Sequence, residues 1–354
     1  MADALRRLGH SVTPFAWHTY IQPSNSESRW GLNFAAVAMR KGQNKYLIGP
    51  VLVRINNDLI DLVARERPAL LFIYRGTHIT AATLKTIREQ SPGTMLVGYN
   101  NDDPFAAGQP RWPWRHFVRA IPEYDRVLAY RRHNIADFVR SGAKATGLLL
   151  PWFVPHIHRP VSLTADERRA YECDVVFVGH FEDDDRLPSL DALARRGVRV
   201  RVFGPGRGSH GPDWDKPLQA FDALRTLAPV RPVWGAEYTK ALCGAKIALC
   251  FLSKRNRDGY TRRCFEGPAT GTPLLSEHSP ELATIFREGV EADFFRSRDE
   301  LVSKVEFYLR HDEARRQLGA AGLTRVFADG HDVDTRMSNM LRELSSTESI
   351  RQAG

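Results

Sequence analysis

The densest group of side chains capable of chemistry lies between Lys254 and Glu266. A helix predicted to run to about Ala269 begins here, and its start is surrounded by five cations: Lys254, Arg255, Arg257, Arg262 and Arg263. A helix N-terminus exposes backbone N–H groups and a partial positive charge, which suits a diphosphate, and nearby Lys or Arg adds charge-assisted hydrogen bonds. Glu266, two turns into the helix, can accept two hydrogen bonds from a ribose diol. The alternative is a surface helix on which Arg262 and Glu266 form a solvated i,i+4 pair.

Polar loops also follow other predicted strands. Short apolar runs rich in Val, Ile and Phe predict buried strands, and the helical patterns between them predict βαβ units with parallel sheets. These runs are residues 70–74, 95–99, 175–178, 198–203, 247–252 and 272–275. Ligands of open α/β sheets bind beyond the carboxyl ends of the strands. That rule selects the segments after the runs, at residues 75–78, 100–104, 179–182, 204–206 and 253–260.

The chain is long enough for two domains, since 354 residues exceed the usual size of one. A second series of strands begins after a proline-rich stretch (Pro151, Pro155, Pro160) that reads as a linker. We therefore expect two doubly wound Rossmann-like domains, at residues 1–155 and 156–330. The remaining residues, 331–354, form a helix that can pack back on the first domain.

The beginning of the chain departs from the usual doubly wound pattern. Residues 2–9 predict an amphipathic helix, and Val12 to Phe15 predict a strand. A doubly wound domain normally starts with a central strand, and none precedes this helix. One hypothesis is that the sequence starts late, at an internal Met, and lacks the first strand with its phosphate-side loop. The other is a domain that begins with a helix.

Composition narrows the classes of function. No apolar run approaches the roughly 18 residues of a membrane span, and the N-terminus has no long apolar stretch. The four cysteines lack paired metal spacing and predict buried, reduced thiols in a cytoplasmic protein. The net charge of +9 allows nucleic acid, an anionic membrane surface or a phosphate-bearing ligand as a partner. Because the basic pairs are scattered and no basic–aromatic cluster occurs, nucleic acid is the least expected of these.

The segment from Asp258 to Leu275 resembles the donor site of GT-B glycosyltransferases, and it is most similar to the CgeB-like (spore-maturation protein type) enzymes. The shared residues are Arg263-Cys264-Phe265-Glu266 followed by Gly271-Thr272-Pro273. Asp258 and Glu266 also match the wider pattern of an acidic residue, seven residues and Glu, with Asp in place of the first Glu. The resemblance implies that Glu266 holds the ribose and that Asp258 holds the transferred sugar.

Weaker resemblance extends over most of the chain. Residues 173–180 look like the opening strand of a nucleotide-binding domain, in which basic residues after Val-Gly and six positions later face the diphosphate. His180 and Arg186 fill those places beside Gly179. The donor-binding set is completed by residues of the loop and helix start: Lys254, Arg257, Tyr260, Arg262 and Arg263. Residues 74–77 and 100–105 also resemble CgeB-like segments. They predict an acceptor side built from Arg75, Thr77, His78 and Asn100. Asp102 or Asp103 is expected there as an acceptor contact or as a base.

The resemblance implies a two-domain GT-B fold with a cleft between its domains. The expected activity is transfer of a sugar, with retention, from a nucleotide-diphosphate sugar to a glycan, lipid or protein acceptor. Asp102-Asp103 and Asp183-Asp184-Asp185 lack the intervening residue of a metal-binding carboxylate pair, so no metal is expected. His156, His158 and Trp152 read as interface or packing residues. The alternatives are a non-catalytic nucleotide-sugar-binding protein of the same fold and a basic nucleic-acid-binding protein.

Overall fold

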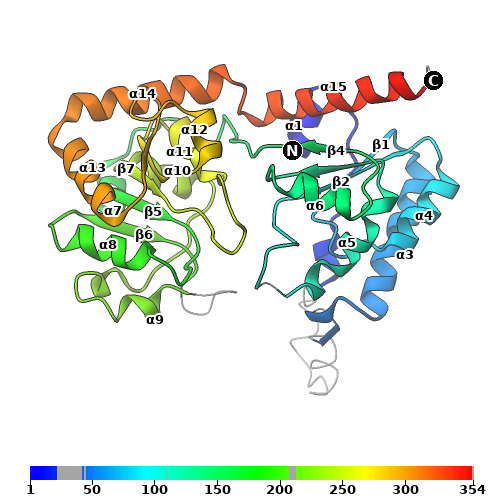
Figure 1. The fold of residues 1–354 in the computed structure, drawn as a ribbon, viewed down its shortest axis with the longest axis horizontal. Coiled ribbons are helices and arrows are strands. Elements are labelled where there is room, and N and C mark those ends of the chain that lie inside the picture. The colour runs from blue at the N-terminus through cyan, green and yellow to red at the C-terminus, as the bar shows by residue number, and fades with distance from the viewer. Residues whose placement is uncertain (22–41, 44, 109, 207–212, 353–354) are drawn as a thin grey trace. The chain divides into compact units, whose positions relative to one another are not determined.

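The computed structural model describes residues 1–21, 42–43, 45–108, 110–206 and 213–352, with side chains described to residue 346 (Figure 1). The chain forms two compact units. The N-terminal unit consists of residues 2–150 together with residues 255–257, and the C-terminal unit consists of Met1, residues 151–254 and the chain from residue 258 onward. Each unit is built on one parallel sheet. The predicted pair of parallel α/β domains is thereby confirmed.

The sheet of the N-terminal unit runs in chain order, β1-β2-β3-β4, with all neighbours parallel. Its core packs Ile55 and Leu59 of a long helix against Leu96 and Phe117. The elements are α1 (Ala2–Arg7), η1 (Trp17–Tyr20), α3 (Pro50–Glu66), β1 (Leu70–Tyr74), α4 (Ala81–Gln90), β2 (Met95–Asn100), η2 (Trp112–Trp114), α5 (Arg115–Ala120), η3 (Ile121–Glu123), β3 (Arg126–Ala129), α6 (Asn134–Arg140) and β4 (Thr146–Leu148).

The strand predicted at Val12 to Phe15 is wrong, because these residues are irregular and lead into η1. Pro14 lies in the middle of the run and has no N–H to donate to a ladder. The helix predicted before it is present as α1.

The sheet of the C-terminal unit has the order β6-β5-β7-β8-β9, again parallel throughout. The order reverses between β5 and β7, and such a reversal is the switch point at which open α/β sheets bind ligands. The elements are α7 (Ala165–Tyr171), β5 (Cys173–Val178), α8 (Arg186–Ala194), β6 (Val200–Phe203), α9 (Asp215–Leu218), η4 (Arg225–Leu227), α10 (Ala236–Cys243), β7 (Ala245–Cys250), α11 (Arg263–Ala269), β8 (Leu274–Glu277), α12 (Pro280–Ile285), β9 (Asp293–Phe295), α13 (Arg298–Arg310), α14 (Asp312–Ala328) and α15 (Val333–Gln352).

The proline-rich stretch predicted as a linker packs into the C-terminal unit. Trp152 and Phe153 are buried, and the Phe153 backbone N–H donates to the His331 carbonyl at 3.2 Å. The Val333 N–H in turn donates to the Phe153 carbonyl at 2.9 Å. This pairing fixes residues 152–153 beside the start of α15.

The Gly204-Pro205-Gly206 segment after β6 is shaped by close backbone approach. A Cβ atom at Gly204 would lie 2.1 Å from the Gly179 carbonyl oxygen, and one at Gly206 would lie 1.9 Å from the Val230 carbonyl oxygen. Only glycine fits at such distances. These glycines therefore serve backbone packing.

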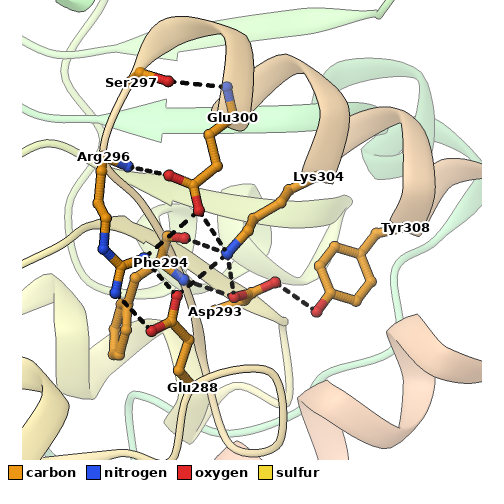
Figure 2. Close-up of polar contacts among 8 residues, drawn as sticks. All are labelled: Glu288, Asp293, Phe294, Arg296, Ser297, Glu300, Lys304 and Tyr308. Atoms are coloured by element: carbon orange, nitrogen blue, oxygen red, sulfur yellow. Dashed lines mark hydrogen bonds and ion pairs between the residues drawn. The ribbon is translucent and has the colours of Figure 1, made fainter.

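A network of ion pairs joins β9 to α13 at the edge of the C-terminal sheet (Figure 2). Lys304 Nζ lies at its centre, 2.8 Å from Asp293 Oδ1, 3.3 Å from Glu288 Oε1 and 3.2 Å from Glu300 Oε1. The Tyr308 hydroxyl donates to Asp293 Oδ2 at 2.8 Å. Such networks are strongest where the carboxylates are buried, as Asp293 is here.

No helix in the described part of the chain is long and apolar enough to cross a membrane. All four cysteines are free thiols, and three of them, Cys173, Cys250 and Cys264, are buried.

Candidate functional site

The loop between β7 and α11 carries most of the predicted donor-binding residues. It closes on itself through the Asp258 N–H, which donates to the Ser253 carbonyl at 2.9 Å. Tyr260 is buried and packs edge-on against Phe265 of α11, with ring centroids 6.3 Å apart. The helix has only seven residues, so its macrodipole is small. Positive charge at the start of this helix therefore comes mainly from the cationic side chains around it, Arg262 and Arg263 among them.

Glu266 is buried, with 7% of its surface exposed, and it lies among groups from three parts of the chain. The Tyr238 hydroxyl of α10 donates to its Oε2 at 2.8 Å. Its Oε1 lies 3.9 Å from His158 Nε2 and 3.8 Å from Arg262 Nε. We call Glu266, Tyr238, His158 and Arg262 the Glu266 cluster. Because the carboxylate is buried, the interpretation as a solvated surface pair is wrong.

Burial raises the pKa of Glu266, against the Arg262 charge and the Tyr238 hydrogen bond, which lower it. Arg262 is almost half exposed, and its guanidinium lies 5.4 Å from the centroid of the buried Trp152 ring. Stacking of this kind holds the cation beside the carboxylate. The cluster thus combines an acceptor carboxylate with a cation that reaches solvent.

His158 reaches the cluster as a neutral imidazole. Burial lowers its pKa to about 4, with the Arg262 charge acting in the same direction. The Val154 N–H donates to His158 Nδ1 at 3.0 Å, so Nδ1 is an acceptor and the single ring proton is on Nε2. That N–H is the one that faces Glu266.

Arg263 lies beside the end of β5. A Cβ atom at Gly179 would stand 3.3 Å from Arg263 Nη1 and 2.8 Å from Phe177 Cζ, so glycine is needed for both neighbours to fit. The guanidinium covers the Phe177 ring at 5.8 Å, and Nε is buried with no hydrogen-bond partner among the described residues. Gly179 and Arg263, both among the residues expected at the donor site, therefore lie side by side.

Arg186 is engaged by its own loop. It is buried and donates to Asp184 through Nε and Nη2, both at 2.8 Å, and to the His180 carbonyl at 2.7 Å. This geometry makes Arg186 a support for the loop after β5. Partial desolvation of the His180 imidazole lowers its pKa, and the Arg263 charge acts in the same direction. Lys254 is paired with Glu277 at the end of β8.

The predicted acceptor-side residues gather after β1 and β2 of the N-terminal unit. Arg75, in a left-handed conformation with φ 67°, forms a 2.7 Å ion pair with Asp102 and lies over the Trp114 ring. Asn100 ends β2 and accepts the Asp102 N–H at 3.0 Å through Oδ1. Asp102 therefore links the two strand ends.

Thr77 and His78 lie deeper in the same unit. Thr77 Oγ1 is 3.0 Å from His78 Nδ1, and the His78 ring stacks on Trp17 at 4.2 Å. Burial lowers the pKa of His78 to about 4. His78 Nε2 and Asn100 Nδ2 are buried without a hydrogen-bond partner among the residues that the structure describes.

Asp103 does not face solvent, and the prediction of a base at this position needs correction. Its exposed fraction is 0%, and its carboxylate accepts from Arg257 Nε at 2.7 Å and from Asn134 Nδ2 at 2.9 Å. His133 Nε2 lies 3.1 Å from the same carboxylate. Burial alone would raise the pKa of Asp103, but the hydrogen bonds from Arg257 and Asn134 bring it below the usual value. A buried carboxylate that holds Arg257 and has a lowered pKa is poorly suited to take a proton.

Sequence reasoning missed Tyr238 and the role of His158. Both are separated from Glu266 along the chain, and only the fold brings them to it. Among the described residues, no group of three or more His, Cys, Asp or Glu side chains is arranged to hold a metal ion.

The sequence was compared with a set of protein families and with curated proteins. Residues 186–342, which include α11 and the β7–α11 loop, match a family model described as glycosyl transferase-like. No curated protein sequence matches the chain.

Solved structures match over most of the chain at low sequence identity. HepE from Anabaena, solved in complex with UDP-glucose, is 14% identical with a TM-score of 0.61, covering 82% of each chain. Sucrose-phosphate synthase from Thermosynechococcus elongatus is also 14% identical with a TM-score of 0.61, covering 84% of this chain and 79% of that one. A glycosyltransferase from Rickettsia africae is 10% identical with a TM-score of 0.59, covering 83% and 81%. Residues 186–342 are therefore glycosyl transferase-like in sequence, and the chain has the fold of GT-B glycosyltransferases.

Proposed function

We propose that this protein transfers a sugar from a nucleoside-diphosphate sugar to an acceptor, with the donor nucleotide held by the C-terminal unit. The observation that carries the proposal is the buried Glu266 carboxylate, held by Tyr238 next to the solvent-reaching cation of Arg262. A carboxylate in this setting suits a ribose diol, and HepE, a protein of the same fold, was solved with UDP-glucose.

The chemistry follows from the charges near α11. When the bond between the anomeric carbon and the phosphate oxygen breaks, negative charge builds on the leaving diphosphate. Arg263, beside Gly179, and Arg262 would stabilise that charge, a task that preorganised cations perform well. The proposal assigns Asp258 to the transferred sugar. It assigns the acceptor to the residues after β1 and β2, with Arg75, Asp102 and Asn100 in contact with it.

The finer features also belong to the proposal. We propose retention of the anomeric configuration, no need for a metal ion, a CgeB-like subtype and a cytoplasmic location that suits free cysteines. The acceptor in this proposal is a glycan, a lipid or a protein.

A thermal-shift panel of UDP-, GDP- and dTDP-sugars tests the donor site. A ligand that binds only the folded state stabilises it by about 2.7 kcal/mol at one hundred times its dissociation constant. We expect one nucleotide class to raise the melting temperature of the wild type and to lose most of that effect in Glu266→Gln. Glu313→Gln, the same change at an exposed position of α14, is the control.

Two results would count against the proposal. If no donor stabilises the wild type, or if Glu266→Gln and Glu313→Gln respond alike, Glu266 does not form a donor site. Stabilisation without release of the nucleoside diphosphate in the presence of acceptor mixtures would favour the non-catalytic nucleotide-sugar-binding alternative.

A further inference from the structure

Glu266 depends on two neighbours that themselves have no assigned part in the reaction. Its Oε2 accepts the Tyr238 hydroxyl at 2.8 Å, which is a good hydrogen bond to a charged acceptor. The His158 Nε2–H and the Arg262 Nε lie 3.9 Å and 3.8 Å from Oε1, beyond hydrogen-bond distance. Oε1 therefore keeps capacity for a ligand hydroxyl, while Oε2 is fixed from the protein side.

The surroundings of Tyr238 and His158 give them fixed geometries. Tyr238 lies on α10, and its ring packs edge-on against the His158 ring with centroids 5.7 Å apart. The backbone N–H of Val154 holds His158 Nδ1, so the ring cannot flip without losing that bond. The adjacent Thr239 hydroxyl donates to the Ile157 carbonyl at 2.9 Å and ties α10 to the residue before His158. Two elements distant in sequence thus form one rigid wall beside the carboxylate.

A glutamate side chain has three rotatable bonds, and a carboxylate free to turn would bind a diol poorly. We propose that Tyr238 and His158 are positioning residues, which orient the Glu266 carboxylate so that Oε1 meets a ribose hydroxyl. This inference rests on the proposed function, because it concerns the same donor site. Tyr238 supplies the hydrogen bond that pins Oε2, and the neutral His158 limits rotation on the other side without neutralising the carboxylate.

Comparison of a ribonucleotide with its deoxy analogue isolates this role. The dissociation constants of UDP and 2′-deoxy-UDP are measured by calorimetry for the wild type and Tyr238→Phe. If the panel above selects another base, the matching pair is used. The wild type should bind UDP about tenfold more tightly than the deoxy analogue, since a hydrogen bond to a charged group is lost. Tyr238→Phe should bind UDP more weakly while its affinity for the deoxy analogue is unchanged, so the ratio falls toward one.

A matched control is present in the same unit. Tyr308→Phe removes an equivalent hydroxyl, which donates to Asp293 at 2.8 Å in the network of Figure 2, and it should leave the ratio as in the wild type. His158→Gln keeps a side chain of similar length beside Oε1, whereas His158→Ala removes it. We expect the ratio to be largely retained in the first variant and lost in the second.

Three outcomes would overturn the inference. The ratio could stay at its wild-type value in Tyr238→Phe, both affinities could fall by the same factor, or His158→Gln could lose the ratio as fully as His158→Ala does. The second outcome would mean that Tyr238 supports the fold in general.

A measurement on the ligand-free protein separates this inference from the proposed function. Removal of the Tyr238 hydrogen bond should raise the pKa of Glu266 further, as followed by carbon-13 NMR of the glutamate carboxyl groups. Tyr308→Phe should leave that resonance unmoved. The wild type could bind no nucleotide while the titration of Glu266 shifts in Tyr238→Phe and not in Tyr308→Phe. In that case the proposed function fails, and the orienting contact between Tyr238 and Glu266 is supported. If Tyr238→Phe leaves the titration of Glu266 unchanged, the positioning role is refuted whatever the protein binds.

Discussion

Acidification should weaken the C-terminal unit through histidines that fold in the neutral form. His331 is buried before α15, with its ring centroid 4.7 Å from that of Phe265. Burial lowers its pKa to about 3, assisted by the charges of Arg336 and Arg325. In the unfolded chain a histidine titrates near about 6.5. Below that pH the unfolded state binds a proton that the folded state does not, so stability is lost as the pH falls from about 6.5 toward 3.

The size of the effect follows from the two pKa values. Between pH 7.5 and pH 5.5 a histidine of this kind costs about 1.3 kcal/mol of unfolding free energy. His158, whose pKa is lowered to about 4, adds a similar loss in the same unit. The raised pKa of Glu266 acts with the opposite sign, because a carboxyl that binds its proton more tightly in the folded state gains stability as the pH falls. The total pH dependence therefore mixes several groups, and a single variant is needed to isolate His331.

His331→Gln removes one titrating group while keeping a side chain of similar size. Urea unfolding is measured at pH 7.5 and pH 5.5 for the wild type and the variant, with the transition of each unit followed separately. The variant should lose about 1.3 kcal/mol less than the wild type over this range. His311→Gln, the same change at an exposed position, is the control. Equal pH dependence in the wild type and His331→Gln would refute the reasoning.

Further substitutions test the packing of each unit. Lys304→Met leaves the carboxylates of Figure 2 without their central cation. The variant should lose about 2–4 kcal/mol of unfolding free energy in urea titrations. A loss below about 1 kcal/mol would show that the network adds little to stability. Gly204→Ala places a Cβ atom 2.1 Å from the Gly179 carbonyl oxygen. The variant should lose more than about 3 kcal/mol of unfolding free energy or fail to fold. Wild-type stability in the same titration would show that the backbone can move to accommodate the methyl group. Arg257→Met removes the cation that pairs with the buried Asp103. It should lower the unfolding free energy of the N-terminal unit by about 3 kcal/mol at pH 7.5. Adding Asp103→Asn to the same chain should restore part of that stability.

Elements with strong local signals could be predicted from the sequence. The strand at residues 70–74 has the predicted bounds, because it is an apolar run with clear ends. The strands β3, β4 and β9 were missed, since each has only three or four residues and lacks a distinctive pattern. No strand forms at Val12 to Phe15, because Pro14 interrupts the apolar run.

The candidate site was predictable only where it is local in the chain. The loop and helix from Lys254 to Glu266 could be found because the residues lie within a few positions of one another. Glu266 and Tyr238 are 28 positions apart in the chain. Between His158 and Glu266 lie the three strands β5, β6 and β7. Asp103 shows a different limit, because polarity suggests exposure and only the fold reveals that the carboxylate is buried.

The membership of residues 255–257 in the N-terminal unit has a consequence for synthesis on the ribosome. The rest of the unit ends at Leu150. Its buried Asp103, however, is paired with Arg257, which lies roughly a hundred residues beyond Leu150. At translation rates of about 5–20 residues per second, the partner emerges some 5–20 seconds after the rest of the unit. A nascent chain released before that point would hold a buried carboxylate without its cation, so the N-terminal half should mature only after much of the second sheet has been made.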